Sequence, residues 1–316
     1  MTRSPILFLI FNRPDTTARV FDSIRKARPA RLYIAADGPR ESRAGEADIC
    51  EHTRKIAQEV DWPCEVKTLL RSKNLGCKKA VSSAIDWFFD NEPEGIILED
   101  DCLPAPDFFR FCDELLEKYR DEPKVGSITG DNFISSTWTP EESYYFSKFS
   151  HIWGWATWRR AWKEYDVGMS DWPSLGPQFL ETQVFADNRK AVKYWSTVFA
   201  KVHQGEIDTW DYQWVFTCFK NGWLSCIPKR NLVTNIGFGP NATHTTSAES
   251  KLANVQTGEL DWRIKHPEPV AASEKADKWT LDQVFEIQMH SWTINRLMAS
   301  LRYRFSLITQ RWSRQK

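Results

Sequence analysis

Three adjacent carboxylates, Glu99-Asp100-Asp101, follow directly on the apolar segment Gly95-Ile96-Ile97-Leu98. Neighbouring carboxylates repel one another, so three of them at the end of a buried strand need positive charge close by. Mg²⁺ and Mn²⁺ prefer carboxylate and phosphate oxygens, and proteins often bind them through one or two carboxylates together with substrate phosphates. The run therefore indicates a site for Mn²⁺ or Mg²⁺ that also takes a phosphorylated ligand. The alternative is a solvated acidic turn.

Two further acids, Asp208 and Asp211, lie close together in an aromatic stretch, where Trp210 and Tyr212 flank Asp211 directly. A carboxylate in such a setting could take a proton from a hydroxyl group, and general base catalysis typically contributes ~10²–10⁴-fold to a rate. Asp208 is a rival for the same task. The alternative for Asp211 is an acid that caps a helix.

The elements around these acids alternate between strand and helix. Continuous apolar runs are typical of strands buried on both faces of a parallel sheet, and the segments between them have helical patterns. We predict strands at residues 6–11, 31–36, 64–71 and 95–98, and helices from residue 15 and at 46–60, 77–90 and 108–119. This order predicts a Rossmann-like α/β fold with a mixed, mainly parallel sheet flanked by helices.

Polar residues follow three of these strands. They are Asn12-Arg13, Asp37-Gly38 and the carboxylate run that begins at Glu99. Ligands of open parallel sheets bind beyond the carboxyl ends of the strands, so we expect the three groups to line one crevice. Arg71 and Lys73 precede the turn Asn74-Leu75-Gly76 and face either a diphosphate or solvent.

The pattern changes after residue 125, where strands become short and aromatic residues gather. We predict strands at 125–129, 144–149, 223–227 and 232–235, and helices at 188–203 and 209–220. Residues 246–280 are polar and are expected to be irregular, and a helical pattern begins at Leu281. The sequence predicts one domain over residues 1–245, with halves at 1–125 and 126–245, followed by a connector and a C-terminal helix over 246–316.

Composition narrows the classes of function. The 316 residues carry a formal net charge of zero, so no overall field favours nucleic acid. The seven cysteines form no C-x-x-C pair, which favours reduced thiols in a cytoplasm over disulfides or a zinc site. The apolar run at residues 6–11 is too short for a signal peptide or a membrane span. We therefore expect a cytoplasmic protein.

Tryptophan is abundant, with 16 residues in the chain. Sugar rings present apolar faces that stack on indole, so a carbohydrate enzyme or a non-catalytic carbohydrate-binding protein would both use such side chains. Filling of a hydrophobic core is the simpler explanation for most of them. Only a catalytic site would also need the three carboxylates at the end of a buried strand.

These motifs together resemble the GT-A glycosyltransferases. The similarity is to the Golgi N-acetylglucosaminyltransferase that initiates complex N-glycans and to bacterial relatives labelled haemolytic-protein-like, or nucleotide-diphospho-sugar transferases. It covers roughly residues 5–245 and depends on the shared order of seven stretches: residues 5–14, 37–38, 74–76, 99–101, 151–158, 210–214 and 237–245.

The resemblance implies a role for each matched residue. Asp101 would bind the metal, Asp100 would approach the donor ribose with Glu99 nearby, and Asp37 would bind the nucleobase. Further donor contacts would come from Asn12, Arg13, Gly38, Arg71, Asn74 and Gly76. Asp211 matches the general base of inverting members, and His244 resembles a late histidine that some members use as a metal ligand. Trp153, Trp155 and Trp210 are expected to bind the acceptor.

The implied activity is transfer of a sugar from a nucleotide-diphosphate sugar to a glycan or lipid-linked glycan acceptor. The inverting outcome depends on Asp211 alone. A sugar nucleotidyltransferase is the alternative within the same superfamily, but it would normally carry a Gly-rich signature where Asn12-Arg13-Pro14 stands. His151 is a second candidate metal ligand, but we expect a structural role for it.

Residues 287–316 combine spaced apolar positions with five arginines, one lysine and no acid. A basic amphipathic helix of this kind suits an anionic membrane surface. We expect either peripheral attachment to the inner face of the cytoplasmic membrane or packing of the helix back on the domain.

Overall fold

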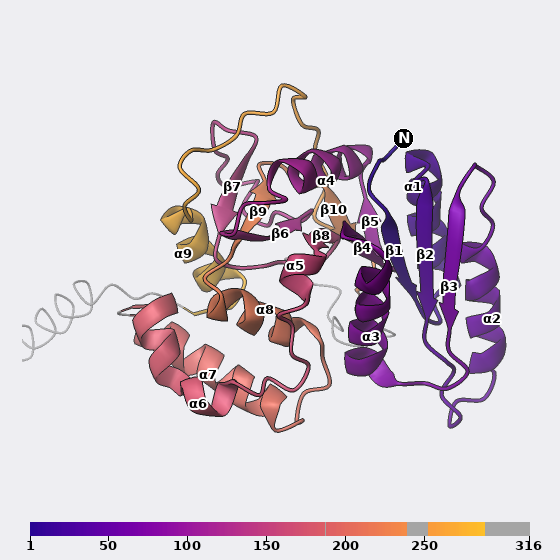
Figure 1. The fold of residues 1–316 in the computed structure, drawn as a ribbon, viewed down its shortest axis with the longest axis horizontal. Helices are drawn as coiled ribbons and strands as arrows, with labels where there is room; N and C mark the ends of the chain where they lie inside the picture. Colours follow the sequence, from indigo (N-terminus) through magenta and orange to yellow (C-terminus); the bar gives the residue numbers. More distant parts are fainter. Residues whose placement is uncertain (187, 239–251, 288–316) are drawn as a thin grey trace, which may run out of the picture.

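A single eight-stranded sheet organises the computed structural model, which describes residues 1–186, 188–238 and 252–287 (Figure 1). Its strand order is β3-β2-β1-β4-β8-β6-β9-β7. The mixed, mainly parallel α/β sheet predicted from the sequence is therefore confirmed. Strands from both predicted halves of the chain belong to this one sheet.

The first half of the sheet is parallel and matches the predicted alternation. Its strands are β1 (Ile6–Ile10), β2 (Arg31–Ala36), β3 (Glu65–Leu70) and β4 (Glu94–Glu99). The helices that follow them are α1 (Pro14–Ala27), α2 (Glu46–Ala57), α3 (Gly76–Asn91) and α4 (Pro106–Lys118). Because Leu9 pairs with Glu99, the carboxyl ends of β1 and β4 lie level at one edge of the sheet.

The second half of the sheet is mixed. β8 (Trp155–Trp158) pairs antiparallel with both β4 and β6 (Val125–Thr129), so β4 and β6 point the same way. β9 (Leu224–Pro228) runs parallel to β6, and β7 (Tyr144–Ser147) forms the antiparallel edge. The carboxyl ends of β4, β6 and β9 therefore share the edge at which β1 ends.

A small separate sheet joins the segment directly after the carboxylate run to a late part of the chain. It consists of β5 (Cys102–Pro104) and β10 (Val233–Asn235) in antiparallel pairing. β5 was not predicted, because three residues are too few for a periodic signal. Its pairing brings the residues after β10 beside Asp101, where the backbone N–H of Ile236 donates to the Asp101 carbonyl at 2.8 Å.

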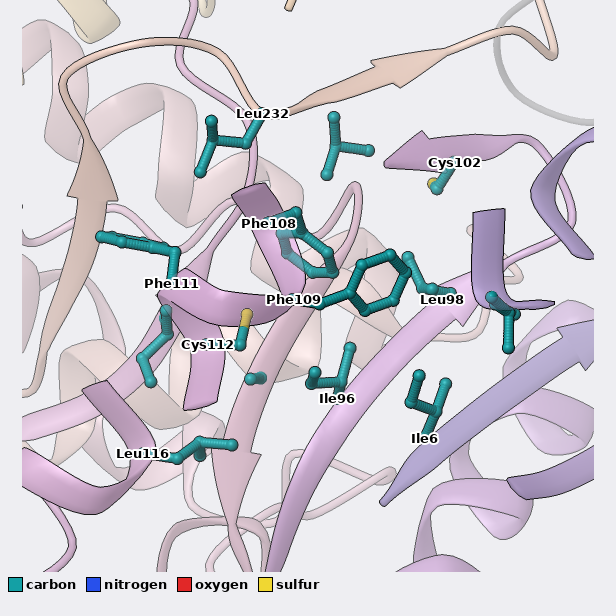
Figure 2. Close-up of a cluster of buried hydrophobic side chains, with 14 of the residues drawn as sticks. Ile6, Ile96, Leu98, Cys102, Phe108, Phe109, Phe111, Cys112, Leu116 and Leu232 are labelled. Carbon is teal, nitrogen blue, oxygen red and sulfur yellow. The ribbon is translucent and has the colours of Figure 1, made fainter. Parts of the chain in front are cut away.

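The two faces of the large sheet carry separate cores. Alternate residues of β1 pack with α1, α2 and α4 on one face, and with α3, α5 (Arg159–Trp162) and α8 (Asp211–Lys220) on the other. Figure 2 shows the contact of β1 and β4 with α4, where Ile6, Ile96 and Leu98 lie opposite Phe108 and Phe109. This packing fixes the strand that ends in Glu99.

A third, aromatic cluster joins α8 to α6 (Trp172–Phe179), a π-helical turn (Leu180–Val184) and α7 (Arg189–His203). It surrounds fully buried Trp195. Figure 1 shows these helices below the second half of the sheet. The predicted helices at 188–203 and 209–220 are confirmed, whereas α6 and the π-helical turn were not predicted.

The C-terminal prediction needs correction. A helix, α9 (Glu274–Gln283), lies inside the segment expected to be irregular, and it ends soon after Leu281, where a helix was expected to begin. The Ser273 hydroxyl caps it by accepting from the Ala276 N–H at 3.4 Å. The predicted amphipathic helix lies almost entirely at residues 288–316, outside the described residues. Within the described ranges, no helix has the length and apolar character to cross a membrane.

Candidate functional site

The carboxylate run lies where β1 and β4 end together. β4 ends at Glu99, and the backbone N–H of Phe11, just beyond β1, donates to Oδ2 of Asp100 at 3.1 Å. Asp100 is buried, with 7% of its surface exposed, whereas Glu99 and Asp101 are half-buried. The end of one strand thus fixes the carboxylate that follows its neighbour.

Arg13 supplies positive charge to this run. Its Nη1 lies 2.6 Å from Oδ2 of Asp101 and 3.5 Å from Oδ1 of Asp100. Burial lowers the pKa of Arg13, but the two carboxylates outweigh burial and raise this pKa above its usual value. The guanidinium therefore stays charged and satisfies part of the need for a cation that the sequence indicated.

One arginine does not balance three carboxylates. Burial raises the pKa of Glu99 well above its usual range, and the negative charges of Asp101, Asp100 and Asp211 raise it further. Burial and the charge of Asp101 raise the pKa of Asp100 to about 7. The cluster would therefore bind additional positive charge favourably, because a second cation would lower the cost of keeping these groups ionised.

Gly237 covers the other side of Asp101. A Cβ atom at this position would lie 2.1 Å from Oδ2 of Asp101, closer than any real contact. The N–H of Gly237 donates to the side chain of Asn235 at 2.8 Å, which fixes the backbone there. Only glycine therefore fits here without displacing the Asp101 carboxylate. The sequence showed this glycine only as part of a generic Gly-rich loop.

The residues present fit a divalent cation that is shared with a phosphorylated ligand. Across the described ranges, no three or more His, Cys, Asp or Glu side chains form a complete set of metal ligands. Mg²⁺ and Mn²⁺ need only one or two protein carboxylates when phosphate oxygens complete their coordination. Asp101 already contacts one cationic group, the Arg13 guanidinium. His244, the other predicted ligand, lies outside the described residues.

Asp37 organises the turn before α3. Its carboxylate accepts from the backbone N–H groups of Gly38, Leu75 and Gly76 at 2.8–3.2 Å and from the Asn74 amide at 2.9 Å. Burial raises the pKa of Asp37, and these backbone donors oppose that effect. A carboxylate has about four lone-pair positions, and four donors occupy them here. The Asp37 carboxylate therefore holds the turn, and its expected bond to a nucleobase stays a prediction.

Gly38, Arg71 and Gly76 are all placed by this turn. A Cβ atom on Gly38 would lie 2.3 Å from the backbone of Lys73, so the two segments touch through their main chains. The charge of Arg71 lowers the pKa of Asp37, which places Arg71 in the same neighbourhood, and its Nη2 donates to Ser83 at 2.8 Å. The predicted donor-side residues of β2 and β3 thus lie together, and their contacts with a donor remain predictions.

Asn12 contacts a different part of the molecule, the start of α2. Its amide donates to Oε1 of Glu46 at 3.0 Å, and Glu46 is buried at the start of α2. Arg40 also pairs with Glu46, and its side-chain hydrogen bond is the main reason that the pKa of Glu46 is lowered. Asn12 is therefore held toward α2, whereas its neighbour Arg13 is directed at Asp101.

The two candidate bases come to the same place as the carboxylate run. Cys77, in the first turn of α3, lies within the electrostatic influence of both groups of acids. Burial raises the pKa of its thiol, and four negative charges raise it further: Glu99, Asp211, Asp208 and Asp37. An acid that follows β2, one at the end of β4 and two at or just before the start of α8 thus all act on the thiol of Cys77. Sequence reasoning did not single out Cys77, although it directly follows the Asn74-Leu75-Gly76 turn.

Asp208 and Asp211 differ in their local environment. Asp208 is exposed and lies beside Gly76, where a Cβ atom would be 3.0 Å from its Oδ2. Asp211 is half-buried in the first turn of α8, and its Oδ1 accepts from the Thr209 hydroxyl and from the Tyr212 N–H at 2.8 Å. Within the described residues, both hydrogen bonds to the Asp211 carboxylate go to Oδ1 and none to Oδ2. Asp211 lies in the first turn of α8, whereas the N-cap residue is Trp210 and no side chain caps the helix there.

The predicted acceptor-binding tryptophans need correction. Trp155 has 0% of its surface exposed and Trp210 has 2%, and their rings stack on each other with centroids 5.7 Å apart. Neither indole face is available to a sugar, so both belong to the core under α3 and α8. Trp153 is half-buried and meets Phe238 edge-to-face at 5.5 Å. It remains a candidate for acceptor binding.

Asp131 and His151 form a second buried polar pair at the same edge of the sheet. Asp131, just beyond β6, has 1% of its surface exposed, and its Oδ2 lies 3.4 Å from Nδ1 of His151. Nε2 of His151 is buried without a hydrogen-bond partner in the described part of the chain. Asp131 also acts electrostatically on Cys102, the neighbour of Asp101. Its position after a parallel strand was the same signal that identified the other site residues.

Comparisons with known proteins find similar solved structures but no match in sequence. No protein-family model matches the chain, and no curated protein matches it in sequence. One similar solved structure is HddC from Yersinia pseudotuberculosis, with 9% identity, coverage of 54% of this chain and 80% of that chain, and a TM-score of 0.31. The glycosyltransferase GlyE of Streptococcus pneumoniae has 10% identity, coverage of 71% and 45%, and a TM-score of 0.31. Mouse xyloside xylosyltransferase 1 has 13% identity, coverage of 68% and 81%, and a TM-score of 0.33. All three TM-scores are below 0.5.

Proposed function

We propose that the chain is a metal-dependent glycosyltransferase that transfers a sugar from a nucleotide-diphosphate sugar to a hydroxyl of a glycan or lipid-linked glycan. The observation that carries this proposal is the convergence of two acidic groups at one edge of the sheet. The run Glu99 to Asp101 lies with Arg13 at the ends of β1 and β4, and Asp211 is close enough to Glu99 to raise its pKa. The resemblance of the motifs to GT-A enzymes points to the same reaction.

The diphosphate of the donor would lie beside Asp101 and Arg13. Asp101 would bind a divalent cation through the oxygen beside Gly237, and such a cation, when bound, neutralises charge that develops on the departing diphosphate. Arg13 adds a planar, permanently charged donor group that suits phosphate oxygens. Glu99 and Asp100 supply the negative field that keeps both cations in place.

Asp211 would take the proton from the acceptor hydroxyl. The Thr209 hydroxyl and the Tyr212 N–H both donate to Oδ1, which orients the carboxylate, and no hydrogen bond from the described residues reaches Oδ2. Attack by an acceptor held on this carboxylate, opposite the diphosphate, gives inversion at the anomeric carbon. Asp208, on the exposed side of Gly76, is the second candidate for this step.

Calorimetric titration with UDP, GDP, dTDP and CMP, with and without Mn²⁺, tests the proposal. We expect one nucleotide to bind in a Mn²⁺-dependent way and Asp101→Asn to weaken that binding at least tenfold. Asp22→Asn, which changes an exposed acid on α1 that pairs with Lys26, is the matched control. A folded protein that binds sugars but no nucleotide would instead be a carbohydrate-binding protein.

A further inference from the structure

Arg13 occupies an oxygen of Asp101 that would also serve as a ligand to a divalent cation. Nη1 of Arg13 contacts Oδ2 of Asp101 at 2.6 Å, and the main chain of Gly237 lies against that oxygen from another side. The side chains of Arg13 and Asp101 are 24% and 14% exposed, so solvent screens their contact only partly. A metal ion bound to Oδ2 beside this guanidinium would place two positive centres in close contact. The two cations therefore compete.

The side chain of Arg13 can change partner while its backbone stays in place. Its carbonyl accepts from the Thr17 N–H at 3.0 Å at the start of α1, which anchors the main chain. Its contact with Asp100 is longer, at 3.5 Å, and adds little directional constraint. A diphosphate arriving at the same edge offers the guanidinium a second anionic partner with a geometry that matches its planar donor groups.

We propose that Arg13 is the resident counter-ion of Asp101 in the donor-free protein and exchanges Asp101 for the donor's diphosphate as the carboxylate takes up a divalent cation. This inference rests on the proposed function for the identity of the diphosphate. It makes metal binding conditional: without a nucleotide diphosphate, Arg13 blocks the metal, and with one, both positive charges have partners. No bond is made or broken in the exchange, which moves one side chain between two anions.

The test measures Mn²⁺ binding to the full chain in the absence of nucleotide, by the electron paramagnetic resonance signal of free Mn²⁺. We expect Arg13→Gln to bind Mn²⁺ at least tenfold more tightly than the wild type, because the competing charge is gone. Arg13→Lys keeps a cation without the planar donor group, and its affinity should lie between the two. Arg19→Gln removes an equal charge from α1, the helix that follows Arg13, and should bind Mn²⁺ as the wild type does.

A second measurement separates this exchange from general electrostatics. The ratio of Mn²⁺ dissociation constants without and with saturating nucleoside diphosphate should fall at least tenfold from the wild type to Arg13→Gln. Wild-type Mn²⁺ affinity in a folded Arg13→Gln protein would overturn the exchange, even if nucleotide binding is intact. If no form binds nucleotide, the proposed function fails, and the nucleotide-free titration still decides whether Arg13 and Mn²⁺ compete. Should Arg13→Gln not fold, Arg13→Lys decides, with unchanged Mn²⁺ affinity counting against the proposal.

Discussion

Gly237 approaches Asp101 so closely that a Cβ atom at residue 237 would lie 2.1 Å from the Asp101 carboxylate. The contact exists because β5 and β10 pair directly after the carboxylate run and directly before this glycine. A residue late in the chain thus sets the space around a side chain at the end of β4. This relationship gives the first test of the site.

Gly237→Ala should displace the Asp101 carboxylate, because the added methyl group and Oδ2 cannot both keep their positions. We expect Mn²⁺-dependent nucleotide affinity to fall at least tenfold, while circular dichroism shows a folded protein. Gly168→Ala is the matched control, since its Cβ would lie 3.3 Å from the Asp166 side chain, which a shift of a few tenths of an ångström relieves. Equal nucleotide affinity in the two variants would show that Gly237 does not shape the site.

Asp37→Asn should destabilise the fold as well as the site. An asparagine would turn an NH₂ group toward backbone N–H donors of the 74–76 turn that now donate to a carboxylate. Hydrogen bonds to charged groups contribute about 1.5–3 kcal/mol, and solvent reduces the contribution of these half-exposed ones to about 1 kcal/mol. Urea unfolding should show this loss, and Asp61→Asn, at an exposed acid, should not. An unchanged midpoint for Asp37→Asn would mean that Asp37 is available for the nucleobase after all.

The parallel half of the fold was predictable because buried parallel strands leave continuous apolar runs in the sequence, and because the residues after those runs meet at one edge. β8 was missed because its four buried residues, Trp155–Trp158, show no polar alternation. The roles of Trp155 and Trp210 were misassigned for a related reason. Indole suits a core and a sugar site equally, and only the packing against α3 and α8 decides between them.

The partners of the site residues were less predictable than their positions. Glycine at 237 and the pairing of Arg13 with Asp101 depend on contacts between segments far apart in sequence. Asp37 was correctly placed at the edge, yet its four donors come from a turn whose geometry no residue type reveals. Tertiary contacts therefore decide which of several polar residues remain available to a ligand.

Asp211→Asn should lower kcat by about 10²–10⁴-fold, the usual contribution of a general base, with little change in donor affinity. Asparagine keeps the oxygen that binds Thr209 and Tyr212 but loses the negative charge. Asp208→Asn, at the exposed neighbour, is the comparison. Product analysis by NMR, which reports the configuration of the new glycosidic bond, accompanies the rates. Near-normal turnover of Asp211→Asn with a large loss of turnover in Asp208→Asn would show that Asp208, not Asp211, is the general base.

Trp153 and Trp155 should separate acceptor binding from core packing. Trp155→Ala removes a fully buried indole, and loss of such a side chain costs about 3–5 kcal/mol of unfolding free energy. Trp153→Ala should leave the protein folded and raise the acceptor KM at least tenfold, with the donor KM unchanged. An unchanged acceptor KM in a folded Trp153→Ala protein would remove the remaining predicted acceptor residue.

Asp277 makes the stability of the protein depend on pH. It lies in α9, its Oδ1 accepts from the Ser147 hydroxyl at 2.5 Å, and its Oδ2 is buried without a partner in the described residues. Burial raises the pKa of Asp277 from 3.8 to about 6, against the opposing effects of Ser147, Lys148 and His151. The folded state therefore binds this proton more tightly than the unfolded state does.

This difference in pKa means that the free energy of unfolding falls as the pH rises. The stability contributed by protonated Asp277 is fully present below about pH 4 and is lost as the pH rises through about 6. The total loss is about 3 kcal/mol, because each unit of difference between the folded and unfolded pKa values corresponds to about 1.36 kcal/mol. Urea unfolding of the wild type and Asp277→Asn between pH 4 and 7 checks this expectation. The difference in unfolding free energy between the two proteins should change by that amount in favour of Asp277→Asn as the pH rises. A difference that stays constant over this range would show that Asp277 is ionised in the folded protein throughout, and that α9 is anchored by a charged carboxylate.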